Sequence, residues 1–349
     1  MAKSKGAYRF SFGPWNIEEG ADPFGPAVRN PVEMGKKLKL YKKLGFHGIQ
    51  LHDDDAVPDF DSKSDAQVAK ECKALKKVLD GEGIQAEFVA PRLWFAAETI
   101  DGAYTNNSAK LRKYAIERTK RCIDVNNHLG TSHMVVWFAR EGSYIRESKN
   151  SREMVLQIRD ALNELLEYDK NIKILIEPKP NEPVDSAIIP TIGHAIGMCY
   201  MTNHNDRMGT LIETAHSLLA GLDPSDDMGY ALAHNKLWSV HLNDQGGLKF
   251  DQDKSFGSFN LRHAFNQVRV LEEYGFAEKC GWVGFDVKAM RTQPQAHNTK
   301  HLSSSLERFK ILVDKVKSLD RKLEAQLIAA RDYEELDRYI LLHLMGKKY

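Results

Sequence analysis

Short runs of β-branched, aliphatic and aromatic residues recur along the chain, separated by longer segments in which apolar residues return every three or four positions. The short runs predict eight strands, at Tyr8–Phe12, His47–Leu51, Ile84–Ala90, Ser132–Trp137, Ile172–Glu177, Met208–Glu213, Lys236–Leu242 and Trp282–Asp286. The longer segments predict helices between most of these strands, at Val32–Leu44, Ala66–Leu79, Ser108–Asn127, Ser151–Tyr168 and Leu261–Tyr274.

Eight strands that alternate with helices favour an α/β fold of the (β/α)8 TIM barrel type, because each crossover packs its helix on the outside of a parallel sheet. An open, doubly wound sheet is the alternative. No Gly-rich dinucleotide or phosphate fingerprint opens any of the predicted helices, which favours the barrel. We therefore predict a TIM barrel over residues 1–300.

The remaining segment, residues 301–349, is rich in Leu, Lys, Glu and Arg and predicts a C-terminal helical extension. Its apolar residues recur at three- and four-residue spacing, at Leu306, Phe309, Leu312, Val316, Leu319, Leu323 and Leu327. Such a stripe must be buried. Two partners fit equally well, namely the barrel of the same chain and a second subunit.

Composition narrows the classes of function. The net charge of +1, from 49 basic and 48 acidic residues, argues against a surface built for nucleic acid. The four cysteines, Cys72, Cys122, Cys199 and Cys280, show no CxxC spacing, so neither a disulfide framework nor a thiolate zinc site is indicated. The chain begins MAKSKGAYRF without an apolar signal core and has no membrane-spanning apolar run, so we expect a cytoplasmic protein.

Candidate chemistry lies where the predicted strands end. TIM barrels carry their active sites at the carboxyl ends of the strands. Polar or aromatic residues stand at or just beyond seven of these ends, at His52, Trp94, Trp137, Glu177, Glu213, His241 and Asp286. The stretch SVHLNDQGGLKFDQD, from Ser239 to Asp253, runs from one of them into a loop with two further acids. We expect these side chains to converge.

Several motifs resemble those of xylose isomerases, in the same order along the chain: FGPWNIEEGADPFG, LHDDDAVP, VVWFAREGSY, IEPKPNEP, LIETAHSLLAGL, HLNDQGGLKFDQDKSFG and GFDVKAMRT. The resemblance covers roughly residues 8–300, and on these motifs the chain is identified as a member of the xylose isomerase-like TIM barrels. It implies a divalent-metal enzyme that moves protons beside a sugar carbonyl.

The resemblance also implies roles for individual residues. It implies an acid–base histidine with a supporting aspartate at His52 and Asp55, and a catalytic lysine at Lys179. It assigns one metal to Glu177, Glu213, His241 and Asp286, and a second metal, which shares Glu213, to His216, Asp251 and Asp253. It places Trp94 and Trp137 in the walls of a sugar pocket. In xylose isomerases the position of His241 holds an aspartate.

Each of these residues also has a structural interpretation. His241 could be a hydrogen-bonded core histidine, Asp251 and Asp253 solvated loop acids, the tryptophans core aromatics, and Lys179 an exposed side chain. A Glu/Glu/His/Asp ligand set suits a transition metal better than an all-oxygen magnesium cage, because imidazole favours transition metals. We therefore expect Mn²⁺, with Co²⁺ and Mg²⁺ as alternatives.

Metal, lysine and acid–base histidine together suit removal of a proton from carbon next to a carbonyl. Within the superfamily the chain is most similar to the catalytic α subunits of bacterial C-glycoside deglycosidases. That similarity implies elimination of the aglycone from a 3-oxo-C-glucoside, in complex with a small β subunit. Aldose–ketose isomerisation, one-metal sugar epimerisation and a non-catalytic sugar-binding barrel are the alternatives.

Overall fold

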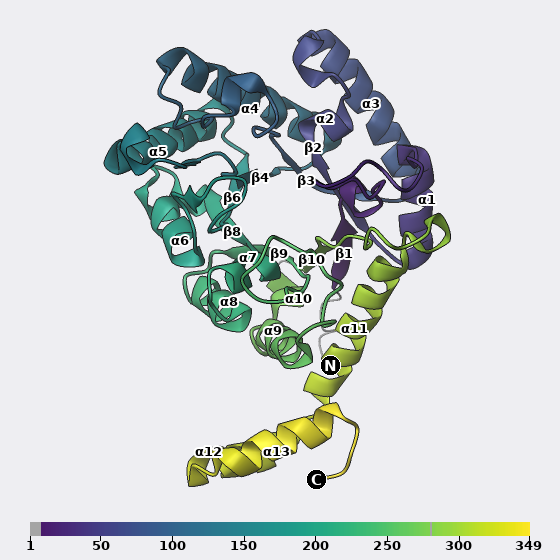
Figure 1. The fold of residues 1–349 in the computed structure, drawn as a ribbon. Helices are drawn as coiled ribbons and strands as arrows, with labels where there is room; N and C mark the ends of the chain where they lie inside the picture. Colours follow the sequence, from purple (N-terminus) through teal and green to yellow (C-terminus); the bar gives the residue numbers. More distant parts are fainter. Residues whose placement is uncertain (1–7, 280) are drawn as a thin grey trace.

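The computed structural model describes residues 8–279 and 281–349. Eight parallel strands close into a barrel in the order β1-β10-β9-β8-β6-β4-β3-β2 (Figure 1). Their bounds are β1 Arg9–Phe12, β2 Gly48–His52, β3 Gln85–Ala90, β4 His133–Trp137, β6 Lys173–Glu177, β8 Met208–Glu213, β9 Leu237–His241 and β10 Trp282–Phe285. The TIM barrel prediction is confirmed, and each predicted strand agrees with the observed one to within one residue at either end.

Helices surround the barrel in Figure 1. Their bounds are α1 Met34–Leu44, α2 Asp53–Ala56, α3 Asp65–Glu82, α4 Ala109–Leu129, α5 Ser151–Tyr168, α6 Ile192–Met201, α7 Thr214–Leu219, α8 Pro224–Ala233, α9 Leu261–Glu273, α10 Phe276–Lys279, α11 Lys300–Lys317, α12 Arg321–Ala330 and α13 Tyr333–Leu344. A two-stranded ribbon joins the loops after β4 and β6, through β5 (Gly142–Ser143) and β7 (Ser186–Ala187).

Local sequence explains why α3 begins and ends where it does. Ser64 caps its first turn by accepting a hydrogen bond from the Gln67 amide, in a capping box. Gly83 ends it in the left-handed conformation, which glycine adopts without steric cost. By contrast, the pattern of the sequence missed α6, because this half-buried helix is apolar on its exposed side as well and shows no clear amphipathic period.

The barrel core is continuous with the packing of α11. Phe309 of α11 lies edge-on to Phe10 of β1, with ring centroids 5.6 Å apart, and to Tyr8 at 5.0 Å. Three cysteines, Cys72, Cys122 and Cys199, are free and buried. Cys280 lies outside the described residues. In the described part of the chain, no helix combines the length and apolar character needed to cross a membrane.

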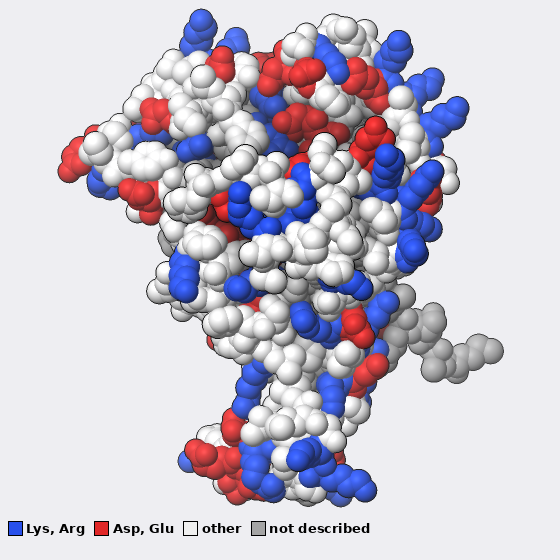
Figure 2. Space-filling model, turned by 45° about the vertical axis from the view of Figure 1, so that its right-hand side comes forward, with Lys and Arg blue, Asp and Glu red and all other residues white. Residues whose placement is uncertain are grey.

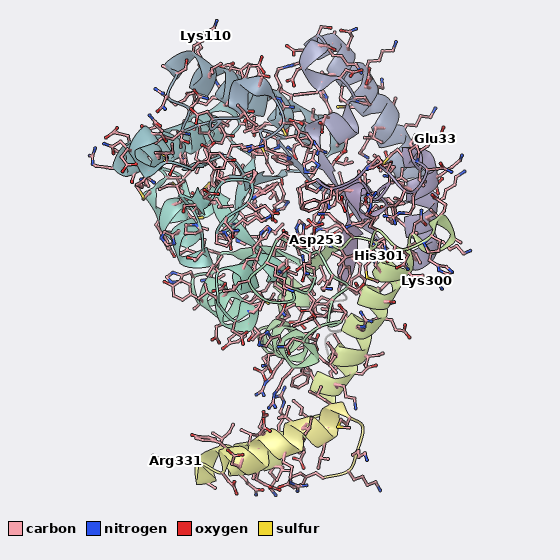
Figure 3. The ribbon with its side chains drawn as sticks, in the orientation of Figure 1. Glu33, Lys110, Asp253, Lys300, His301 and Arg331 are labelled. Atoms are coloured by element: carbon pink, nitrogen blue, oxygen red, sulfur yellow. The ribbon has the colours of Figure 1, made fainter. Side chains whose placement is uncertain are left out.

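The predicted C-terminal stripe is divided between two helices. Its first part, from Leu306 to Val316, is buried on α11, whereas Leu327 lies on α12 beyond a break at residues 318–320. Figure 1 shows α12 and α13 projecting from the end of α11, and Figure 3 places Arg331 at the tip of this hairpin. An ion pair of 2.6 Å between Arg269 of α9 and Glu324 of α12 ties the hairpin to the barrel helices.

The surface turned toward the viewer in Figure 2 carries acidic and basic side chains interspersed over both the barrel and the C-terminal hairpin. This mixture agrees with the near-zero net charge of the chain. The division of the chain at residue 300, where α11 begins, stays a prediction.

Candidate metal centre and sugar pocket

A cavity of about 210 Å³ lies at the carboxyl ends of the barrel strands. Eleven of the twelve residues predicted for the site line it, namely His52, Trp94, Trp137, Glu177, Lys179, Glu213, His216, His241, Asp251, Asp253 and Asp286. Figure 3 shows Asp253 over the middle of the barrel. The twelfth, Asp55, is not among these lining residues, and its carboxylate lies 2.8 Å from the ring nitrogen Nδ1 of His52 in a hydrogen bond. The barrel therefore brings the predicted residues to one place.

One group of side chains in the cavity consists of Glu177, Glu213 and His241, the last residues of β6, β8 and β9. All three side chains are buried. His241 Nδ1 lies 3.5 Å from Glu177 Oε1 and 3.9 Å from Glu213 Oε2. Neither ring nitrogen of His241 has a hydrogen-bond partner. A buried imidazole is normally hydrogen-bonded, so this arrangement leaves donor atoms free to hold a metal ion.

The charges in this group depend strongly on one another. Burial alone would lower the pKa of His241, but the adjacent Glu177 carboxylate raises it well above its usual value. Burial opposes ionisation of Glu177, yet the neighbouring His241 lowers its pKa to about 2. For Glu213, burial dominates and raises the pKa well above its usual value. Three buried ionisable groups that depend on each other for charge compensation suit a site for a cation.

A second group surrounds His216. Its Nε2 lies 3.3 Å from Glu213 Oε1 and 3.2 Å from Asp251 Oδ2. Lys179 donates a hydrogen bond of 2.8 Å to the same oxygen of Asp251. Burial lowers the pKa of Lys179, but Asp251 more than offsets this and raises it. Lys179 is therefore a buried ammonium, and the surface-exposed alternative for this residue is wrong.

A third group joins Asp253 and Asp286 to Glu213. Asn243 bridges two of these acids, donating to Glu213 at 2.8 Å and to Asp253 at 3.2 Å. Lys288 forms an ion pair with Asp253. The resemblance implied that Asp286 belongs to the first metal site and that Asp253 belongs to the second, with His216. In the structure Asp286 lies with Asp253, and Asp253 is separate from His216. Glu213 is common to all three groups.

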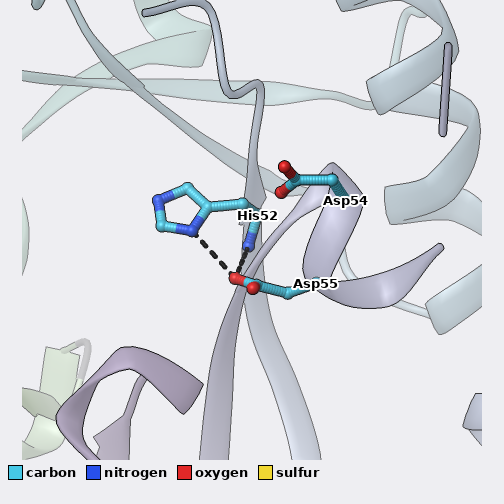
Figure 4. Close-up of side chains that lie close together, drawn as sticks. All are labelled: His52, Asp54 and Asp55. Atoms are coloured by element: carbon cyan, nitrogen blue, oxygen red, sulfur yellow. Dashed lines mark hydrogen bonds and ion pairs between the residues drawn. The ribbon is translucent and has the colours of Figure 1, made fainter. Parts of the chain in front are cut away.

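On the opposite side of the cavity, His52 lies at the end of β2 and Asp55 in the first turn of α2 (Figure 4). Asp55 accepts hydrogen bonds from the His52 ring, at 2.8 Å, and from the His52 backbone amide, at 3.0 Å. Asp54 completes an acidic cluster whose ligand atoms lie close enough for a metal. The Arg92 guanidinium contacts all three residues, so a protein cation already compensates part of the negative charge of the cluster.

Aromatic rings form the wall between His52 and Lys179. Trp15 lies 4.6 Å from the His52 ring, and Trp94 meets it edge-on at 5.2 Å. The ring centroids of Trp94 and Trp137 lie 4.7 Å apart, and Lys179 Nζ lies 5.1 Å from the centroid of the Trp137 ring. A pocket with an aromatic wall and a polar floor is the usual form of a site for a small polar ligand.

Sequence reasoning missed three side chains that hold the others in place: Trp15, Arg92 and Lys288. Trp15 Nε1 donates a hydrogen bond of 2.8 Å to Asp286 Oδ1, from a 3-10 helix, η1 (Pro14–Asn16), that directly follows β1. Trp15 and Lys288 stood inside the quoted motifs and could have been found there. Arg92 gave no such signal, because only the tertiary structure brings β3 beside α2.

Solved structures with the same fold include three sugar- or metal-related proteins. L-ribulose 3-epimerase has a TM-score of 0.64 and 14% sequence identity, with 93% of this chain and 99% of that one covered. The 3-keto-D-glucoside 4-epimerase YcjR from E. coli has a TM-score of 0.61 and 13% identity, covering 86% and 99%. The IOLI protein, solved with a zinc atom, has a TM-score of 0.63 and 16% identity, covering 89% and 100%.

These identities are low enough that the three structures establish the shared fold alone. The family is established by the sequence itself. Residues 38–310 match the family model described as the xylose isomerase-like TIM barrel, which is well over half of the chain. With the closed eight-stranded barrel and the polar cavity at its carboxyl end, this match shows that the chain belongs to the xylose isomerase-like TIM barrel family.

Proposed function

We propose that this protein is a divalent-metal-dependent enzyme that moves a proton on the carbon next to a sugar carbonyl. One observation carries the proposal. His241 is buried between two carboxylates, and neither of its ring nitrogens has a hydrogen-bond partner. Leaving buried polar atoms unpaired is costly, and a metal ion would satisfy one of these nitrogens together with both carboxylates.

The residues present fit such an ion. Glu177, Glu213 and His241 offer ligand atoms within 4.8 Å of one another. Asp286 lies in the adjoining group around Glu213 and can complete the set. The mixture of carboxylates and imidazole supports Mn²⁺ as the resident ion, with Co²⁺ or Mg²⁺ as weaker candidates. A zinc atom in the IOLI protein supports a divalent cation in general.

A second ion would use Glu213, His216 and Asp251, with Asp253 in the adjoining group around Glu213. His216 Nδ1 and Asp251 Oδ1 have no hydrogen-bond partner, which leaves ligand atoms for it. However, two of these acids already form ion pairs, Asp251 with Lys179 and Asp253 with Lys288. We therefore propose the Glu177–Glu213–His241 group as the tighter site.

A bound divalent ion would polarise the sugar carbonyl and stabilise negative charge on its oxygen. The protein's own residues supply the rest. His52, held by Asp55, faces the cavity and moves the proton. Lys179 keeps a buried positive charge close to the carboxylates, where it attracts developing negative charge on a sugar oxygen. Trp15, Trp94 and Trp137 pack around the sugar and exclude water.

For the reaction itself we propose elimination from a 3-oxo-C-glucoside. His52 removes the proton at C2, the C2–H electrons form the C1–C2 double bond, and the C1–aryl bond breaks with its electrons leaving on the aryl carbon, which takes up a proton. A cavity of about 210 Å³ accommodates a single sugar ring, and the aglycone would extend past Trp94 to Phe95, whose side chain is 71% exposed. The name of the similarly folded 3-keto-D-glucoside 4-epimerase supports an oxidised glucoside as substrate class.

Sugar isomerisation or epimerisation is the second candidate, because the same proton removal followed by reprotonation gives either product. The acidic residues around Glu213 and the similarly folded L-ribulose 3-epimerase support it. Only the first candidate function, the elimination reaction, involves a small β subunit. The apolar side chains of Leu248, Phe250 and Phe259, each more than 60% exposed on the loop after β9, are candidates for its contact surface.

The test is an assay of purified protein, made metal-free by chelation and then given Mn²⁺, on a 3-oxo-C-glycoside and on D-xylose. Each substrate is tried with and without a co-expressed β subunit. We expect no turnover without metal, recovery with Mn²⁺, and release of the aglycone only with the β subunit. Full activity after exhaustive chelation, with no metal found by elemental analysis, would contradict the metal mechanism. Turnover of D-xylose alone would favour the isomerase.

A further inference from the structure

Arg92 contacts the acid–base histidine directly. It follows β3 by two residues, and its Nη2 lies 2.7 Å from His52 Nδ1. The same guanidinium donates to Asp54 at 2.7 Å through Nε and to Asp55 at 3.3 Å through Nη2. It also lies over the rings of Trp94 and Phe95, 5.5 and 5.2 Å from their centroids. Its side chain is only 16% exposed, so the guanidinium is held firmly in this position.

Two partners thus compete for one ring nitrogen of His52. Asp55 accepts a hydrogen bond from Nδ1 only when Nδ1 carries the proton, which leaves Nε2 with a lone pair. A guanidinium has donors and no acceptor, so Arg92 can hydrogen-bond Nδ1 only when Nδ1 carries no proton. In that case the neutral ring carries its proton on Nε2. Asp55 and Arg92 therefore favour opposite tautomers of the same imidazole.

The two tautomers differ in what they offer the cavity. With Asp55 as the partner of Nδ1, Nε2 can take a proton. With Arg92 as the partner, Nε2 carries the proton and can donate a hydrogen bond to a substrate oxygen. An ordinary His–Asp pair already takes a proton on Nε2 and later returns it, so that task alone does not require Arg92.

We infer that Arg92 is a positioning residue that gives His52 a second neutral tautomer, with the proton on Nε2, in which the ring donates a hydrogen bond into the cavity instead of accepting a proton from it. The inference rests on the proposed function in one respect, namely that His52 is the acid–base group. The choice of tautomer is a property of the protein without substrate and is tested there.

The test is nitrogen NMR of full-length protein labelled with ¹⁵N-histidine, metal-free and without substrate, at a pH where His52 is neutral. The His52 signals are assigned by their loss in His52→Gln. In the wild type we expect ring-nitrogen shifts between the values of the two pure tautomers. In Arg92→Met they should move to those of a single tautomer, protonated on Nδ1. In Asp55→Asn they should move the other way.

Arg140→Met is the matched control. Arg140 also sits beside the Trp94 loop, donating to the Trp94 carbonyl at 3.2 Å, but its guanidinium extends to the Tyr144 hydroxyl instead of to His52. Its replacement should leave the His52 shifts unchanged. Arg92→Met leaves Asp54 and Asp55 without their guanidinium partner. The double variant Arg92→Met, Asp54→Asn removes one of these two charges and keeps the experiment informative if the single variant folds poorly.

Unchanged His52 shifts in folded Arg92→Met protein, or in the double variant, would overturn the inference whether or not the protein acts on sugars. If a substrate is found, kcat of Arg92→Met should fall about 10- to 100-fold with little change in KM, a part of the about 10²- to 10⁴-fold that acid–base catalysis contributes. Shifts that change as expected while no sugar is turned over would uphold the tautomer inference and count against the proposed function alone.

Discussion

His241→Ala is the change that tests the metal centre most directly. His241 is buried at the end of β9, faces Glu177 and Glu213, and has no hydrogen-bond partner on either ring nitrogen. If it is a metal ligand, the alanine variant should lose most of its metal affinity. If it is only a core histidine, the variant should keep its metal.

The magnitude follows from what the side chain contacts. Loss of a residue that merely supports a ligand typically weakens metal binding about 10- to 100-fold. Loss of a ligand itself should cost at least the upper figure, or about 2.7 kcal/mol of binding free energy. In the metal-free protein, removing His241 strands no hydrogen-bond partner, but it removes the positive charge that lowers the pKa of Glu177, so that this carboxyl group should take up a proton.

Thermal unfolding with and without Mn²⁺ converts this difference into a measurement. At a Mn²⁺ concentration about 100 times the wild-type Kd, binding stabilises the native state by about 2.7 kcal/mol. This should raise Tm by roughly 4 °C in a protein of this size. At the same concentration a variant with 100-fold weaker binding gains only about 0.4 kcal/mol. Elemental analysis of both purified proteins gives the metal content independently.

His301→Ala provides the control. His301 is also a buried histidine, but its Nε2 donates a hydrogen bond of 2.7 Å to the Asn16 carbonyl, outside the metal centre. This variant should lose about 1–3 kcal/mol of stability and keep its metal. His241→Asp should also retain metal, with a preference shifted toward Mg²⁺, because a hard oxygen replaces imidazole. A His241→Ala protein that is metal-replete and merely destabilised would refute the reasoning.

Three further predictions concern residues around the centre. Trp15→Phe removes the 2.8 Å hydrogen bond to Asp286 and should weaken metal binding about 10- to 100-fold in a calorimetric titration, whereas unchanged affinity would show that Asp286 is not a ligand. Gly284→Ala should also lower metal affinity, because its Cβ would come within 2.8 Å of His241 Cδ2, and an unaltered metal titration would contradict this. Burial lowers the pKa of His301 to about 4, from 6.5. Between these two pH values the unfolded chain binds a proton that the folded chain does not. The free energy of unfolding should therefore fall as pH drops from about 6.5 to about 4, by up to about 1.4 kcal/mol per pH unit. Urea unfolding measures this fall, which should be absent in His301→Gln.

The sequence by itself determined the barrel. Each strand is a compact apolar run bounded by polar residues, and a buried parallel strand requires this composition wherever it lies in the fold. For the same reason the ends of the strands were readable, and with them the positions of Glu177, Glu213 and His241. Helices with one apolar face, such as α5, were equally visible. The mostly apolar helix α6 could not be recognised in the sequence, because apolar residues stand on its exposed face as well as on its buried face.

Only the tertiary structure decided how the polar residues are grouped. Asp251 and Asp253 stand two residues apart in the sequence, yet one pairs with Lys179 and the other with Lys288. Between the two pairs the loop after β9 turns, and the backbone of Asp253 takes a positive φ of 45°. Arg92 reaches His52 because β2 and β3 are neighbours in the barrel. Local sequence patterns record which face of a strand or helix is buried. Contacts between side chains 40 residues apart depend on how the strands are placed around the barrel, and this became visible only in the folded chain.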